Sequence, residues 1–68
     1  MKIGEKLRNL RIEHGLLQRE VGQALQTTQT AVGKWEREEN LPNVYILIKL
    51  AKFYNISFDE LLEDVDEE

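Results

Sequence analysis

The chain has 68 residues, of which 41% are hydrophobic, and its 13 Asp and Glu outnumber its 9 Lys and Arg, so the formal net charge is -4. A chain of this length folds as one small domain, which buries too little surface for the deep cleft of a multilayer enzyme. It has no cysteine and one histidine, which excludes a disulfide framework and a thiolate or imidazole zinc site. No apolar run reaches the ~18 residues of a membrane span. These counts predict a cytoplasmic domain without metal, cofactor or membrane association, and the acidic total argues against a nucleic-acid partner.

The acidic residues are concentrated at the C-terminus. Residues 63–68 carry five acids and no base, which leaves 8 acids, 9 bases and a net charge of +1 for residues 1–62. Blocks of like charge at chain ends are usually solvated and frayed. The sequence therefore predicts a folded domain over residues 1–62 and a disordered acidic tail over residues 63–68. The tail is either simply solvated, or it repels non-specific DNA or begins a linker.

Apolar side chains recur every three or four residues, which is the spacing of one face of a helix, and no segment alternates with the period of a strand. The pattern predicts five short helices: about 2–13, 18–25 and 29–37, one capped by Asn43 and one opened by the capping box Ser57–Glu60. His14-Gly15 ends the first helix, and Thr28 is the best N-cap for the third. Because helices of two or three turns are not stable alone, we expect one all-α bundle.

The second and third of these helices are joined by about three residues. Gly22 lies inside the second helix, where glycine costs about 1 kcal/mol relative to alanine, so we expect a close crossing by the third helix to require it. The apolar positions on either side of the turn face the core: Val21, Leu25, Val32 and Trp35. This spacing predicts a helix-turn-helix at about residues 18–37.

With residues elsewhere in the chain, this motif resembles the phage repressor and Cro-like helix-turn-helix family, also called Xre-like regulators. The resemblance runs from Ile3 to Leu62 and is carried by residues 3–11, 15–16, 18, 22, 32, 35–37, 42, 47–52 and 57–62. It implies a compact five-helix repressor-like DNA-binding domain. Such a domain binds a palindromic operator in double-stranded DNA as a homodimer, with its third helix in the major groove, and regulates transcription, here as a repressor.

The resemblance also assigns the DNA contacts by position. The candidates for base contacts are Thr28, Gln29, Thr30, Gly33 and Lys34, whose polar groups suit base edges. The candidates for phosphate contacts are Gln18, Arg19, Arg37 and Asn40, of which the last three are weaker candidates that are otherwise ordinary surface residues. Gln18 is also expected to brace Gln29. Gly33 has no side chain, so it lets the helix backbone approach DNA closely, or it is a tolerated exposed glycine.

Other positions are expected to hold the domain together. In the family an arginine late in the first helix pairs with the glutamate after the Trp position, which implies a structural salt bridge between Arg11 and Glu36. Trp35 shares the apolar stripe and is expected in the core rather than stacked on a base. The residues expected at the dimer contact, unless they fill the core, are Phe58, Leu61 and Leu62.

The chain departs from the family pattern at several positions. Gln26 replaces the turn glycine, so we expect a non-glycine residue at positive φ, at a cost of about 1 kcal/mol. Leu17 replaces the Ser or Thr that caps the second helix. Glu38 replaces a glycine and is followed by Glu39, and both acids would repel a nearby phosphate.

Two other function classes fit the sequence less well than DNA binding. An enzyme is a poor alternative, because capping explains Ser57 and no nucleophile, base and orienting group can be assembled around His14. A protein-binding module of antitoxin or adaptor type is the stronger alternative. Glu38, Glu39 and the acidic tail would suit a basic protein partner.

Overall fold

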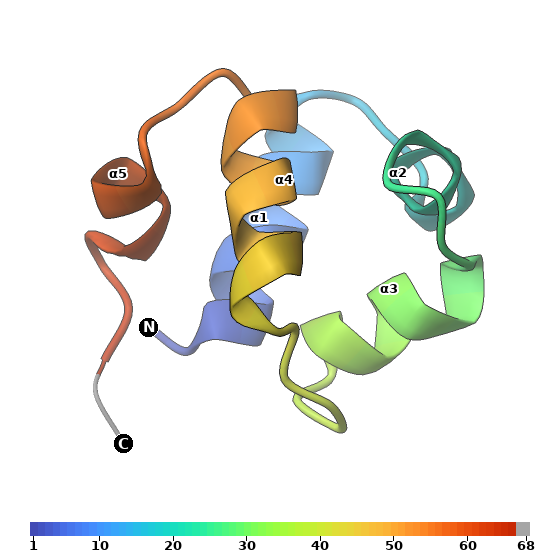
Figure 1. Ribbon diagram of the computed structural model, residues 1–68. Helices are drawn as coiled ribbons and strands as arrows, with labels where there is room; N and C mark the ends of the chain where they lie inside the picture. The colour runs from blue at the N-terminus through green and yellow to red at the C-terminus, as the bar shows by residue number, and fades with distance from the viewer. Residues whose placement is uncertain (67–68) are drawn as a thin grey trace.

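The computed structural model describes residues 1–66, which form five helices and no strand (Figure 1). The helices are α1 (Ile3–Glu13), α2 (Gln18–Ala24), α3 (Gln29–Glu36), α4 (Val44–Phe53) and α5 (Phe58–Leu62). The first three lie within one residue of their predicted bounds at each end, and the all-α prediction is confirmed. None of these five helices has the length and apolar character needed to cross a membrane.

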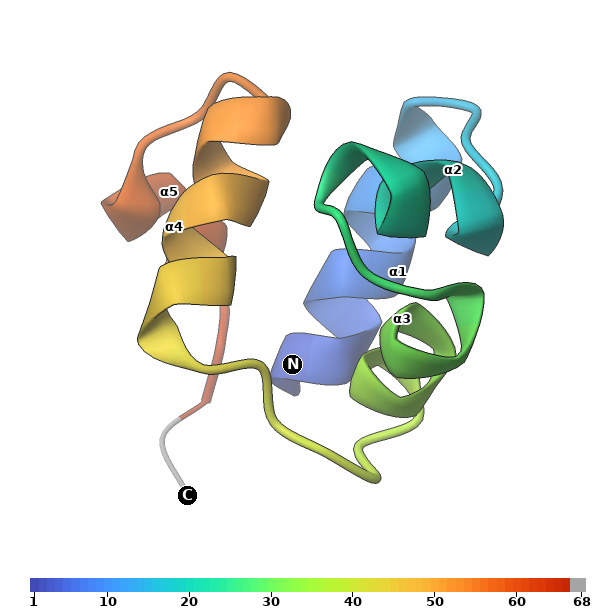
Figure 2. The same cartoon turned by 45° about the vertical axis from the view of Figure 1, so that its right-hand side comes forward.

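α1 stands between α2 and α3 on one side and α4 and α5 on the other (Figure 2). α3 packs against both α1 and α2, while α5 packs against α4. The apolar faces meet in one core, formed by Leu7, Leu10, Val21, Leu25, Val32, Trp35, Leu50, Ala51, Tyr54 and Leu61. Trp35 is only 8% exposed, which confirms that it packs in this core.

Gly22 of α2 faces the start of α3. A Cβ on Gly22 would lie 2.9 Å from the carbonyl carbon of Thr28, closer than real Cβ atoms come to other atoms, and a tight 3.1 Å from the amide nitrogen of Gln29. Because these are backbone atoms, they cannot move aside without moving the helix. The close crossing predicted at Gly22 is confirmed, and it sets where the first turn of α3 lies.

Three of the helices begin at capping residues that the sequence indicated. Thr28 and Asn43 each accept a hydrogen bond from the backbone N–H three residues further on, at 3.1 and 3.0 Å. Ser57 and Glu60 each accept a hydrogen bond from the other's backbone N–H, at 3.0 and 2.9 Å. These bonds satisfy N–H groups that a helix leaves without a partner in its first turn, and they fix where each helix starts.

A residue with positive φ follows each of the first four helices. These residues are Gly15, Gln26, Glu38 and Asn55, with φ of 68°, 60°, 64° and 57°. The expectation for Gln26 is confirmed. A left-handed conformation costs roughly 1 kcal/mol outside glycine, so core packing must offset that cost at Gln26 and Glu38.

Residues 63–66 turn back to the start of the chain. The Met1 amino group donates to the Asp64 carbonyl at 2.7 Å and lies 3.2 Å from the Asp66 carboxylate, whose backbone N–H donates to the Met1 carbonyl at 2.9 Å. Asp64 also lies 3.6 Å from Lys6 Nζ. Two residues of the predicted tail, Asp64 and Asp66, thus contact the N-terminal residues, whose positive charges match their carboxylates. Residues 67–68 of that tail lie outside the described residues.

Candidate nucleic-acid interface

The first turn of α3 is open to solvent. Thr28, Gln29 and Thr30 are all exposed, and they present hydroxyl and amide groups without charge. The Thr28 hydroxyl oxygen accepts the capping bond from Ala31 N–H, which leaves its hydrogen and its methyl group for an outside partner. An exposed helix end of this chemistry suits base edges, since Gln pairs with adenine and Thr contacts several bases.

Gly33 and Lys34 lie one turn further along α3 and are less exposed. A Cβ on Gly33 would lie 2.9 Å from Arg37 Nη1 and 3.4 Å from Gln18 Oε1. The helix backbone that was expected to be open at Gly33 is therefore covered in the free domain, because the long side chains of Arg37 and Gln18 fold over it. Lys34 is half-buried. Base contacts by both residues stay predictions.

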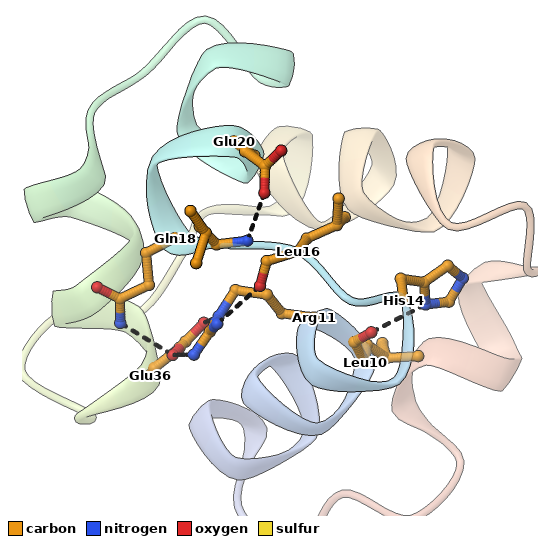
Figure 3. Close-up of polar contacts among 8 residues, drawn as sticks. Leu10, Arg11, His14, Leu16, Gln18, Glu20 and Glu36 are labelled. Atoms are coloured by element: carbon orange, nitrogen blue, oxygen red, sulfur yellow. Dashed lines mark hydrogen bonds and ion pairs between the residues drawn. The ribbon is translucent and has the colours of Figure 1, made fainter.

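Arg11, Gln18 and Glu36 join the first three helices through one network of hydrogen bonds (Figure 3). Arg11 Nε donates to Glu36 Oε2 at 2.7 Å, and Arg11 Nη2 donates to Glu36 Oε1 at 3.1 Å. Gln18 Nε2 donates to the same Oε1 at 3.0 Å, and Arg11 Nη1 donates to the Leu16 carbonyl at 2.9 Å. The salt bridge predicted from the sequence is present, and it extends to Gln18, which the sequence did not link to it.

This network lies close to the core. Only 13% of the Arg11 side chain and 4% of the Glu36 side chain are exposed. The hydrogen bond to Glu36 raises the pKa of Arg11 above its usual value, so the guanidinium stays charged. Burial raises the pKa of the nearby Tyr54 to about 12, and the charge of Glu36 adds to that rise. The end of α3 is therefore anchored to α1 and α2 by a pair with little access to water.

A shallow hollow opens where the start of α2 meets the start of α3. It is lined by Arg11, Leu17, Gln18, Arg19 and Gln29. Three candidate DNA contacts, Gln18, Arg19 and Gln29, are thus brought together from two helices. Within residues 1–66 the Gln18 side chain is hydrogen-bonded to Glu36 and not to Gln29, so the bracing of Gln29 stays a prediction.

Leu17, which stands where the family carries a capping Ser or Thr, has no side-chain acceptor. Its own backbone N–H donates to Glu20 Oε1 at 2.8 Å. The carboxylate of α2 thus supplies one part of a capping box from inside the helix.

The two acids after α3 point to different partners. Glu39 Oε2 accepts a hydrogen bond from Arg37 Nε at 2.6 Å, and both side chains are more than half exposed, at 52% and 56%. Glu38 instead accepts a hydrogen bond from the backbone N–H of Gly4 in the first turn of α1. Sequence reasoning missed this role of Glu38. The available signal was Lys2, which stands at the N-cap of α1 and offers no acceptor of its own.

The side chains expected at the dimer contact divide between core and surface. Leu61 is 0% exposed and Leu62 packs against the core, so Leu61 has no surface to offer a second copy. Phe58 is 37% exposed. The sequence did not single out the other exposed apolar side chains before and in α4, of which Leu41 and Tyr45 are the most exposed, at 76% and 74%.

The described part of the chain gathers no residues for metal binding or covalent chemistry. Residues 1–66 contain no group of three or more His, Cys, Asp or Glu side chains placed to hold a metal ion. His14 Nδ1 lies 2.8 Å from the Leu10 carbonyl, and its ring packs 4.7 Å from that of Tyr54. Ser57 is engaged in capping. What the surface around α3 offers is hydrogen-bond donors and acceptors.

Several known proteins are similar to this chain in sequence and in fold. A helix-turn-helix family matches residues 7–61. The transcriptional activator BcrR of Enterococcus faecalis is 37% identical over 62 residues, which is 91% of this chain and 30% of BcrR. The transcriptional regulator ImmR of Bacillus subtilis is 32% identical over 62 residues, which is 91% of this chain and 49% of ImmR. The chain thus spans less than half of the length of each of these curated relatives.

A solved structure of similar length has the same fold as this chain. The P22 c2 repressor, in a crystal structure with synthetic operator 9T, matches with a TM-score of 0.81 at 31% identity, over 90% of this chain and 92% of that chain. The relatives named here are transcriptional regulators, as the interpretation of the chain as a non-enzyme predicts. The family match covers all or part of each of the five helices described above. The chain belongs to the helix-turn-helix family, among the phage repressor and Cro-like (Xre-like) regulators.

Proposed function

We propose that this domain binds double-stranded DNA in a sequence-specific manner, with α3 in the major groove, and that it regulates transcription. The first turn of α3 carries the proposal: Thr28, Gln29 and Thr30 are exposed and uncharged, on a helix whose other end is anchored by the network around Glu36. The similar P22 c2 repressor supports it, because that protein was crystallised with a synthetic operator.

The candidate phosphate contacts flank this turn. Gln18 and Arg19 begin α2 and share the hollow with Gln29, while Arg37 and Asn40 follow α3 and are exposed. Phosphate contacts fix the orientation of a protein on DNA, and base contacts select the sequence. In this proposal Gln29 is the principal base reader, with Thr28, Thr30, Gly33 and Lys34 as its neighbours along the groove.

We further propose that two copies bind one palindromic operator. Two recognition helices related by a two-fold axis reach half-sites about 34 Å apart, which one domain cannot do. A second copy would cover apolar side chains that the free domain leaves exposed, such as Phe58, Leu41 and Tyr45. Bound over a promoter, such a dimer would act as a cytoplasmic repressor by excluding the polymerase.

The test is selection of bound sites from a library of random duplexes. We expect a palindrome whose half-sites lie about 10 base pairs apart, and binding that falls steeply as salt is raised. Enrichment of no sequence, together with no retention on random duplexes at about 50 mM salt, would contradict DNA binding. Enrichment of a single, non-repeated site would contradict the dimer alone.

A protein-binding module of antitoxin or adaptor type is the alternative. The acids that favoured it in the sequence have partners within the chain: Glu38 bonds to Gly4, Glu39 to Arg37, and Asp64 lies near Lys6. These pairings leave less free negative charge for a basic partner. We therefore place this alternative second, and loss of all DNA binding in the experiment above would favour it.

A further inference from the structure

An exposed ion pair lies directly after α3. Glu39 Oε2 is 2.6 Å from Arg37 Nε, and the backbone N–H of Glu39 donates to the carbonyl of Lys34 at 2.9 Å. The second bond ties Glu39 to the last turn of α3, so its carboxylate is held beside that turn. The pair is therefore part of the surface around α3 rather than of a separate loop.

The guanidinium of Arg37 extends back along α3 into the proposed interface. Its Nη1 atom lies 2.9 Å from the position a Cβ on Gly33 would take, and Gln18 Oε1 lies 3.4 Å from the same position. Arg37 thus sits between the middle of α3 and the start of α2, where the proposal needs a phosphate contact. Hydrogen bonding to Arg37 lowers the pKa of Glu39, and the charge of Lys34 adds to this, so the carboxylate is ionised at neutral pH.

A carboxylate and a phosphate oxygen compete for the same planar donors of an arginine. We propose that Glu39 is an internal competitor for DNA phosphate: it occupies Arg37 in the free domain, must release it on binding, and so lowers affinity for all DNA sequences. This inference rests on the DNA-binding function proposed above. It assigns to Glu39 a contact that sets affinity and leaves base preference unchanged, because phosphate contacts carry no sequence information.

The neighbouring acid, Glu38, is not expected to compete with phosphate in the way proposed for Glu39. Glu38 turns toward α1, where it accepts a hydrogen bond from Gly4 N–H, and it makes no ion pair with Arg37 among the described residues. The two adjacent glutamates therefore differ in what they bind. Only Glu39 holds a cation of the proposed interface.

The experiment measures binding of purified Glu39→Gln, Arg37→Gln and double-variant proteins to a random-sequence duplex of about 30 base pairs, at several salt concentrations. The matched control is Glu13→Gln, which removes one exposed acid from the far end of α1. We expect Glu39→Gln to bind about 2- to 5-fold more tightly, the range that an exposed ion pair supports. We also expect its salt dependence to steepen by about one cation, because the Glu39 carboxylate that the wild-type protein frees on binding takes up a cation, and Gln does not.

The double variant separates competition from simple repulsion. If Glu39 acts through Arg37, Glu39→Gln gains nothing in the Arg37→Gln background. An equal gain in both backgrounds, or in Glu13→Gln, overturns the inference, since charge alone then explains it. No gain from Glu39→Gln in a wild-type protein that binds DNA also overturns it, while the proposed function stands. Absence of DNA binding by the wild-type protein and Glu13→Gln overturns the proposed function, and this inference with it.

Discussion

The two ends of α3 differ in almost every physical respect. At its start, Thr28, Gln29 and Thr30 are exposed and uncharged, and Gln29 borders the hollow between α2 and α3. At its end, Glu36 is anchored by Arg11 and Gln18, and its side chain is 4% exposed. One end is available to an outside partner, and the other fixes the helix in the domain. The difference shows how a helix of 8 residues can be both rigidly held and open to recognition.

The largest effect is expected at the anchored end. Glu36→Ala leaves the Arg11 guanidinium without its carboxylate in a poorly hydrated site, and we expect the free energy of unfolding to fall by about 3 kcal/mol. Urea denaturation followed by circular dichroism measures this. The control is Glu5→Ala on the exposed face of α1, which should change stability by less than about 0.5 kcal/mol. Equal stability of the two variants would show that the network does not anchor α3.

The next effect is expected at the open end, and in binding rather than stability. Gln29→Ala should weaken binding to a selected operator by about 1–3 kcal/mol, because a bidentate base contact is lost. Binding to random duplexes and the unfolding midpoint should barely change. Gln23→Ala, at an exposed glutamine of α2, is the matched control. Equal losses on selected and random DNA would mean that Gln29 contacts phosphate.

A smaller effect is expected in the turn after α3. Glu38→Ala removes the acceptor for Gly4 N–H and keeps a side chain at φ 64°, so we expect it to lower stability by about 1 kcal/mol. Glu38→Gly loses the same acceptor but relieves the left-handed conformation, and should be the more stable of the two. Thermal unfolding ranks them. The reverse order would show that the conformation of this turn carries no cost.

The smallest effect is expected in the middle of α3, between the two ends. A Cβ at Gly33 would meet only the tips of the Arg37 and Gln18 side chains, which can move, so Gly33→Ala should stabilise the free domain by about 0.5 kcal/mol. Operator binding should weaken, because the added methyl group displaces Arg37 and keeps the backbone from DNA. Equal or tighter binding by this variant would remove Gly33 from the interface.

Most of the helical framework was predictable, because local signals in the sequence determine it. Capping at Thr28, Asn43 and Ser57 fixed where three helices begin, and Gly22 indicated the crossing of α2 and α3. These features depend on neighbours a few residues away or on a single backbone approach. The outward-facing role of the first turn of α3 was expected from the family resemblance, which assigned base contacts to Thr28, Gln29 and Thr30.

Several contacts around the candidate site could not be predicted in this way. The bond from Gly4 to Glu38 joins residues 34 apart, and the sequence assigned Glu38 effects on outside partners alone, as repulsion of phosphate or attraction of a basic protein. The covering of Gly33 depends on how the flexible side chains of Gln18 and Arg37 fold, which periodicity does not encode. Leu61 and Phe58 are separated by less than one helical turn, and only the packing of α5 on α4 shows that Leu61 is buried and Phe58 is exposed.

The close approach at Gly22 has a consequence for how such a domain could acquire a new target. Since backbone atoms of Thr28 and Gln29 set the position of α3, exchanging the side chains at Gln29 and Thr30 leaves the scaffold unaltered. Operator preference could then diverge through one or two substitutions without compensating changes in the core. The same property makes these two positions the natural place to randomise when a retargeted variant is sought.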